Sequence, residues 1–134
     1  MKTRINPANF TKTVGAYSQG LKVDLGDKAL VFVSGQLAMD AEGNPVAPGD
    51  FGAQTRYIFE NIKRILGEAG AALEDVVKVQ IFVTDITKFP QVSAVRNEYL
   101  SDIKPVSTLL EINRTVREGC EIEIEVTAIM ENPK

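Results

Sequence analysis

The chain has 134 residues, of which 44% are hydrophobic and 25% charged, and its net charge is −3. This length and composition are typical of one globular domain, residues 1–134, that builds its core without a disulfide or a metal. An acidic chain with scattered Lys and Arg disfavours nucleic-acid binding. The absence of histidine excludes Ser-His-Asp and Cys-His catalysis and most zinc sites.

Cysteine content and hydropathy favour a cytoplasmic protein. The single cysteine, Cys120, excludes an internal disulfide, and no apolar stretch is long enough to span a membrane. The first ten residues, MKTRINPANF, lack the apolar core that a signal peptide needs. We therefore expect the chain to work in a reducing cytoplasm, with no membrane partner.

The first third of the chain predicts two strands and a loop. Residues 1–12 are interpreted as an irregular lead-in. The run YSQGLKV at 17–23 predicts a weak strand, and ALVFVS at 29–34 predicts a stronger one, because it is rich in β-branched and aromatic residues. A short LGDK turn between them indicates a hairpin, and the turn-forming residues at 40–49 indicate a loop.

Two helices are predicted, at 51–68 and 89–100. Asp50 is a plausible N-cap for the first helix, and Pro90 fits the first turn of the second. Apolar residues recur at helical spacing in both. The predicted inner faces are Phe51, Ile58, Ile62, Ile65 and Leu66 in the first helix, and Phe89, Val92, Val95 and Tyr99 in the second.

Three further strands are predicted at 76–83, 107–112 and 121–129. The element order is then ββαβαββ, which indicates an α+β fold with one mixed sheet and both helices on a single face. The opposite sheet face is left uncovered. ALVFV and STLL are apolar at successive positions, so both faces of these strands favour burial. A small protein with such a face usually buries it against copies of itself, so we expect a homo-oligomer.

Several motifs, in their order and spacing, are specific in combination although each alone is weak. They are Gly15-Ala16-Tyr17-Ser18-Gln19, Val33-Ser34-Gly35-Gln36, Gln54, Asn61, Val77-Lys78, Phe82-Val83, Asp85, Phe89, Pro105 and Glu121-Ile122-Glu123-Ile124-Glu125. Together they resemble the RidA/YjgF family over about residues 5–130. The resemblance implies a chorismate-mutase-like fold and a homotrimer with a central β-barrel and three clefts between subunits. It also implies hydrolysis of reactive enamines and imines, with no cofactor and no metal.

The resemblance implies catalytic roles for Glu123 and Tyr17. Glu123 matches the family glutamate that positions or activates the attacking water, and Tyr17 matches a tyrosine that lines the cleft. A wet polar strand face is the alternative for Glu123, since Glu121 and Glu125 lie on the same face. A tyrosine packed at a strand edge is the alternative for Tyr17.

Four residues are expected to bind the substrate. Ser34 and Gly35 match the family's Ser-Gly pair, where glycine permits close approach of a ligand to the backbone. Ser107 stands where the family has the arginine that clamps a substrate carboxylate, and Ser93 stands where many members have asparagine. Arg96 replaces an aromatic residue usual in the family; a helix-surface position is favoured for it, with the relocated cation as the alternative. Other nearby cations, for which a solvated surface position is favoured, are Lys104, Arg114 and Arg117.

Three functions remain open at this point. The first is an imine or enamine deaminase with an altered substrate range, because Ser107 replaces the arginine. The second is a non-catalytic ligand-binding or chaperone-like trimer that kept the cleft. The third, ribonuclease activity, a label sometimes attached to the family, is disfavoured by the acidic chain, the absence of histidine and the lack of a basic stripe.

Overall fold

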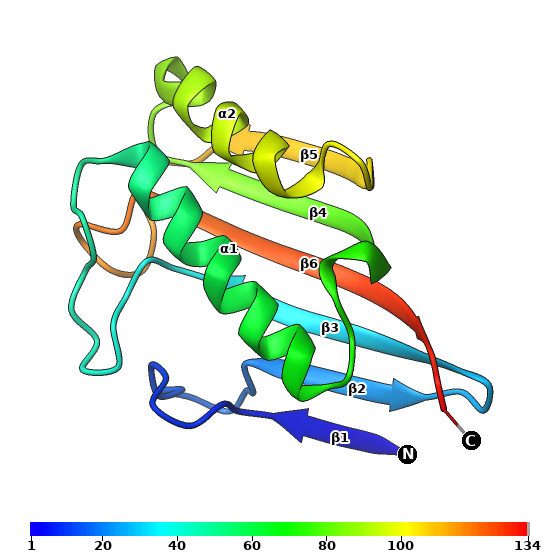
Figure 1. Ribbon diagram of the computed structural model, residues 1–134. Helices are drawn as coiled ribbons and strands as arrows, with labels where there is room; N and C mark the ends of the chain where they lie inside the picture. The colour runs from blue at the N-terminus through cyan, green and yellow to red at the C-terminus, as the bar shows by residue number, and fades with distance from the viewer. Residues whose placement is uncertain (134) are drawn as a thin grey trace.

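A six-stranded mixed sheet carries two helices on one of its faces (Figure 1). The computed structural model describes residues 1–133. The elements are β1 (Lys2–Ile5), β2 (Gly20–Asp24), β3 (Lys28–Gln36), α1 (Phe51–Glu68), the 3₁₀ turn η1 (Leu73–Asp75), β4 (Val76–Val83), the 3₁₀ turn η2 (Ile86–Lys88), α2 (Phe89–Leu100), β5 (Val106–Glu111) and β6 (Ile122–Glu131). The predicted α+β fold, with one mixed sheet and two helices, is confirmed.

The strand order is β1-β2-β3-β6-β4-β5, so β6 lies in the middle although it comes last in the chain. It pairs antiparallel with both β3 and β4, and only β4 and β5 are parallel. The parallel pair is joined by α2, because parallel neighbours need a crossover connection. This topology leaves β1 and β5 as the two edge strands.

The N-terminal part differs from the prediction. Residues 1–12 contain a strand, β1, which pairs antiparallel with β2. The strand predicted at 17–23 begins only at Gly20, and Tyr17 lies in the preceding loop. The loop is fixed by side chains, since the Gln19 backbone N–H donates to the Asn6 Oδ1 at 3.0 Å. Tyr17 is thereby free of the sheet ladder and available to a cavity.

Both helices begin as predicted, and their apolar sides form the core. The Asp50 carboxylate accepts from the Ala53 N–H at 3.0 Å, which caps α1. The Phe59 and Tyr99 rings stack at 4.9 Å between centroids and join α1 to α2. One predicted inner position is wrong: Phe89, at the start of α2, is 39% exposed. The largest fully buried apolar side chains are Phe59, Ile58, Ile62, Ile65, Leu66, Ile81, Ile122, Ile124, Val31, Val79 and Val83.

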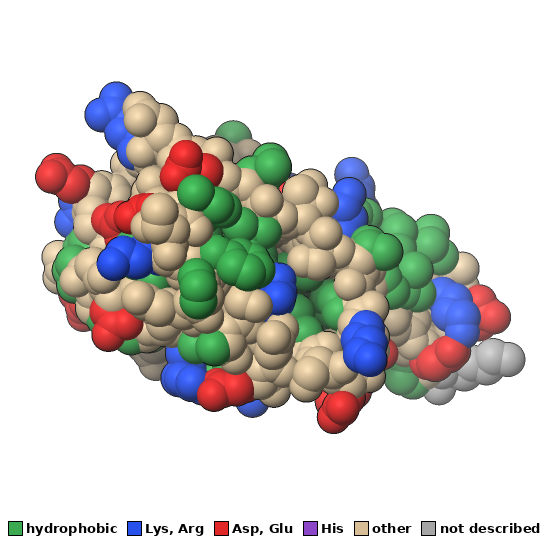
Figure 2. All heavy atoms as spheres, turned by 90° about the horizontal axis from the view of Figure 1, so that it is seen from above, with side chains coloured by type: hydrophobic (Ala, Val, Ile, Leu, Met, Phe, Trp, Pro, Cys, Tyr) green, Lys and Arg blue, Asp and Glu red, His purple; other side chains and the backbone are tan. Residues whose placement is uncertain are grey.

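The sheet face turned away from the helices, called here the open face, is partly apolar and uncovered in the single chain. Phe32 is 41% exposed, Leu110 52% and Ile129 44%. The register places Phe32 beside Thr127, and Leu110 beside Phe82 and Glu123, all on the side opposite the buried Ile122 and Ile124. The uncovered face follows the prediction from the sequence. Figure 2, which looks onto the α2 and β5 end from above, shows hydrophobic side chains gathered between separate charged ones.

Candidate functional site

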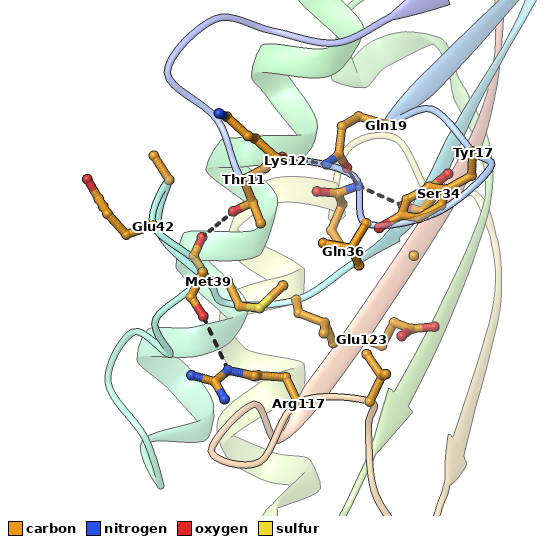
Figure 3. Close-up of a pocket in the computed structure, with 16 residues that line it drawn as sticks. Thr11, Lys12, Tyr17, Gln19, Ser34, Gln36, Met39, Glu42, Arg117 and Glu123 are labelled. Atoms are coloured by element: carbon orange, nitrogen blue, oxygen red, sulfur yellow. Dashed lines mark hydrogen bonds between the residues drawn. The ribbon is translucent and has the colours of Figure 1, made fainter.

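A cavity of about 710 Å³ lies where the ends of β3 and β6 meet three loops (Figure 3). Four of the six predicted site residues line it: Tyr17, Ser34, Gly35 and Glu123. Figure 3 shows Tyr17 and Ser34 at the upper right of the view, Glu123 below them, and Arg117 lower still and further to the left. The cavity is named here after Glu123. Its other lining residues are Thr11, Lys12, Val14, Gln19, Gln36, Leu37, Met39, Ala41, Glu42, Gly43, Val116 and Arg117.

A break in the β3–β6 ladder shapes the floor of this cavity. The register shifts between Val33, which pairs with Val126, and Gln36, which pairs with Ile124. Ser34 and Gly35 therefore form a bulge opposite a single residue of β6. Bulges of this kind bend a strand and re-aim its side chains, often beside functional sites.

Glycine at position 35 makes room for the Glu123 carboxylate. A Cβ added to Gly35 would lie 2.5 Å from Glu123 Oε2 and 2.7 Å from its Cδ, closer than real Cβ atoms come to such neighbours. Glycine is required at this position because it has no side chain, and not because of its backbone φ angle. Glu123 thus lies flat against the bare backbone of the bulge.

The electrostatic setting of Glu123 favours its protonated form. The side chain is half-buried, and burial raises the pKa of the Glu123 carboxyl above its usual range. The Glu125 carboxylate, two residues along the same strand face, raises that pKa further. A carboxyl whose pKa is raised by burial is a candidate proton acceptor and donor in catalysis.

A wall of amide side chains orders the upper part of the cavity. Gln36 Nε2 donates to Gln19 Oε1 at 2.9 Å and to the Ser34 carbonyl at 3.0 Å, and Gln19 Nε2 donates to the Thr11 carbonyl at 2.8 Å. The Ser34 hydroxyl donates to the Ser18 carbonyl at 2.6 Å. Gln19 and Gln36 are buried. Neither was predicted as a site residue, although both stand in motifs that carry the family resemblance.

The loops around the cavity are fastened by Gln54 on α1. Its Nε2 donates to the Val46 carbonyl at 3.0 Å and to the Gly119 carbonyl at 2.7 Å, and its Oε1 accepts from the Glu121 N–H at 2.8 Å. On the rim, Arg117 Nε donates to the Gly43 carbonyl at 3.2 Å. The two loops that flank the cavity are therefore tied to each other and to the helix layer.

The other two predicted residues lie elsewhere, at the edge of the sheet. Ser107, on β5, lines a groove of about 450 Å³ together with Arg96, Lys104, Leu100 and others. Ser93 is one helical turn from Arg96 and accepts a hydrogen bond from its Nη2 at 2.8 Å. This groove is named here after Ser107. Its remaining lining residues are Val79, Asn97, Ser101 and Pro105.

The cavity and the groove lie on opposite faces of the sheet. Ser107 pairs with Val79, and Val79 with the buried Val126, so Ser107 belongs to the row that faces the helices. Glu123 is three positions before Val126 on β6, an odd number, so it lies on the open face. Within one chain the six predicted site residues therefore form two groups, and no small molecule can touch both at once.

The fold, the cavity and the edge groove define a small α+β protein with two separated polar sites. The chain belongs to the RidA/YjgF family: the family model described as Endoribonuclease L-PSP matches residues 8–130. A relative from Pyrococcus abyssi, a RutC family protein, is 39% identical over 120 residues, which cover 90% of this chain and 91% of that protein.

Solved structures agree with this assignment. The YjgF gene product of E. coli matches with a TM-score of 0.80 and 31% identity, covering 95% of this chain and 98% of that one. TdcF of E. coli, solved with bound serine, matches with a TM-score of 0.81 and 28% identity, covering 96% and 98%. Among residues 1–133 no helix has the length and apolar character needed to cross a membrane.

Proposed function

We propose that this protein is a small-molecule hydrolase of the imine or enamine deaminase type, working in clefts between the subunits of a homotrimer. The observation that carries the proposal is the half-buried Glu123 carboxyl, held against Gly35 in a cavity with an ordered polar wall. Carboxyls in such settings serve as general acids and bases. The serine bound to TdcF supports a small, amino-acid-like ligand for this family member too.

The proposed reaction consumes one water and releases one ammonia. Glu123 accepts a proton from water as the water oxygen bonds to the C=N carbon and the π electrons move to nitrogen. Glu123 then gives that proton to the nitrogen, which completes the carbinolamine. Glu123 next takes the hydroxyl proton of the carbinolamine and passes it to the nitrogen, the C–N bond breaks as the C=O bond forms, and ammonia leaves with Glu123 ionised again. An enamine first gains a proton on carbon and loses one from nitrogen to become the imine. Tyr17 and Ser34 offer hydroxyls, and Gly35 offers bare backbone, to hold the reacting group.

Two features support assembly as a homotrimer. The open face exposes Phe32, Leu110 and Ile129, and such a face favours burial against sibling chains. The Glu123 cavity and the Ser107 groove also cannot meet within one chain, as their strand register shows. We propose that the groove of one subunit closes the cavity of its neighbour, as the family's clefts between subunits imply. The buried free thiol of Cys120 fits a reducing cytoplasm.

A second candidate is a trimer that binds small molecules in the same clefts without turning them over. It is favoured by one observation: Ser107 brings no charge to the position where the family has a carboxylate-clamping arginine. RNA cleavage, which the name of the family model suggests, has weaker support. The chain has a net charge of −3 and no histidine, so neither phosphate attraction nor imidazole acid–base chemistry is available.

An imine-decay assay tests the proposal. An amino-acid oxidase generates 2-imino acids from several amino acids, and the imine absorbance is followed with and without the protein. We expect the protein to speed the decay well above the buffer rate. Ligand binding without any acceleration would favour the non-catalytic trimer and reject the hydrolase.

Replacing Gly35 by alanine should abolish most of this activity and leave the fold intact. The three atoms nearest to the new Cβ all belong to the flexible Glu123 side chain, so the carboxylate is displaced while the backbone stays in place. We expect kcat to fall about 100-fold, in line with the usual contribution of a positioned acid or base, with little change in the melting temperature. A Gly43→Ala control is unsuitable because Gly43 has a positive φ, so Gly67→Ala, where a Cβ meets nothing, is the matched control. Full activity in Gly35→Ala would contradict the role given to Glu123.

A further inference from the structure

Arg96 is a half-buried cation without an acidic partner. Its Nη2 donates to Ser93 Oγ at 2.8 Å and its Nε donates to Asn97 Oδ1 at 3.2 Å. The guanidinium also lies over the Phe89 ring, with its carbon 5.9 Å from the centroid. Both hydrogen-bond partners are neutral, and within residues 1–133 Arg96 forms no salt bridge. Its orientation is fixed while its charge is left uncompensated.

The Ser107 groove is positive in a protein that is acidic overall. Arg96 and Lys104 both line it, and no Asp or Glu is among its lining residues. Lys104 has a φ of 51°, in the left-handed region that non-glycine residues rarely adopt. Its N–H donates to the Leu100 carbonyl at 2.9 Å, which places it just beyond the end of α2. Two cations thus flank a hydroxyl, Ser107, in a groove whose charge suits an anion.

The Glu123 cavity is a poorer place for an anion. It also holds two cations, Lys12 and Arg117, but Glu42 and Glu123 line the same space. Lys12 and Arg117 are exposed, as Lys104 is, whereas Arg96 is half-buried, and water screens exposed charges more strongly than half-buried ones.

We propose that Arg96 is the carboxylate-binding residue of this protein, oriented by Ser93, with Ser107 donating a hydrogen bond and Lys104 adding a second charge. The proposal rests on the proposed function, since it places the groove of one subunit over the Glu123 cavity of the next. With the imine or enamine hydrolysis proposed above, Arg96 then binds the carboxylate of the substrate and of its 2-oxo acid product. The serine at position 107 then leaves space for a guanidinium that comes from α2 instead of β5.

The test measures binding of a product, 2-oxobutanoate, by calorimetry, with 2-oxobutanamide as the uncharged probe. We expect the acid to bind and the amide to bind at least about 10-fold more weakly, because a charge-assisted hydrogen bond is lost. Arg96→Gln should weaken binding of the acid about 10- to 100-fold and leave binding of the amide unchanged. Ser93→Ala should weaken binding of the acid a few-fold by releasing the guanidinium.

Charge rescue gives a second readout. The double variant Arg96→Gln with Ser107→Arg restores a guanidinium to the same groove and should recover most of the lost affinity. Arg56→Gln is the matched control: Arg56 is a helix-surface arginine paired with Glu98, and its loss should leave binding unchanged. Circular dichroism checks that each variant remains folded.

The outcomes separate this inference from the proposed function. Equal binding of acid and amide, or full affinity in Arg96→Gln, would overturn it even if the protein hydrolyses imines. Weakening by Arg117→Gln in place of Arg96→Gln would overturn it as well, and would assign the carboxylate to the cavity. Arg96-dependent binding without turnover would support the inference and reject the hydrolase. No binding of 2-oxobutanoate at millimolar concentration would overturn the inference outright.

Discussion

Replacing Glu123 by glutamine should lower kcat for imine hydrolysis by about 10²- to 10⁴-fold, the usual contribution of a positioned general acid–base group. The amide has nearly the same shape, so it fits against Gly35, but it cannot accept a proton from water. The KM should change little, because the carboxylate of the substrate is bound elsewhere. Steady-state kinetics on one 2-imino acid, generated in the cuvette, measures both constants.

The same variant should be more stable than the wild type at neutral pH. Burial raises the folded-state pKa of Glu123 above its unfolded value, so ionisation of this group costs more free energy in the folded chain than in the unfolded chain. Stability from this group is therefore full below its unfolded pKa of about 4.3 and is lost as pH rises through the raised folded pKa. Glu123→Gln removes this loss of stability, because glutamine does not ionise. Its thermal advantage should be present at pH 7 and disappear near pH 4.

Glu125→Gln is the control for both effects. Glu125 raises the pKa of Glu123 through its charge, so its removal should move the acid limb of the pH–kcat profile to lower pH. Maximal kcat should be retained, because Glu125 has no part in proton transfer. An unchanged kcat in Glu123→Gln, at any pH, would remove Glu123 from the mechanism.

Introducing a charge at Phe32 should break the assembly and, with it, all activity. Phe32 lies on the open face of β3, with its side chain 41% exposed in the single chain. Burying a glutamate there between subunits costs several kcal/mol per chain, so we expect association to weaken at least about 100-fold. Sedimentation velocity of Phe32→Glu should show a folded monomer. The imine-decay assay should show no rate above buffer.

Leu25→Glu is the matched control for this change. Leu25 is 58% exposed, but it lies in the turn between β2 and β3 and not on the open face. We expect it to keep both assembly and activity. A monomeric Phe32→Glu variant with full activity would show that the site is complete within one chain.

Local patterns in the sequence were sufficient to predict the helices. α1, α2 and β4 have the predicted bounds, because helical periodicity, the Asp50 cap and Pro90 act over a few residues. β1 was missed because KTRI has only one buried residue, Ile5, and is held by its pairing with β2. Lys and Arg on a short edge strand protect it from further pairing and also conceal it in the sequence.

The candidate site was predictable in part. The grouping of Tyr17, Ser34, Gly35 and Glu123 in one cavity followed from the family resemblance. The placement of Ser107 and Ser93 on the other side of the sheet could not be predicted from that resemblance. It depends on the β4–β5 register, which sets the face to which Ser107 belongs.

The exposed fraction of each arginine side chain could not be predicted from the sequence either. Nothing in the sequence distinguishes the burial of Arg96 from that of Arg114 or Arg117, since all three are arginines. Packing of Phe89 and a hydrogen bond to Ser93 hold only the first of them half-buried in the groove. These contacts join residues on one face of α2, so they arise only once that helix has formed.

The proposed function depends most on a site shared between two subunits, and a mixing experiment tests this directly. Glu123→Gln damages only the cavity, and Ser107→Glu places an opposing charge only in the groove. Each variant alone should be nearly inactive. The two variants are unfolded, mixed in equal amounts and refolded into trimers of random composition. About one quarter of the clefts then combine an intact cavity from one variant with an intact groove from the other. We expect about a quarter of wild-type activity, and no recovery at all would contradict a site formed between subunits.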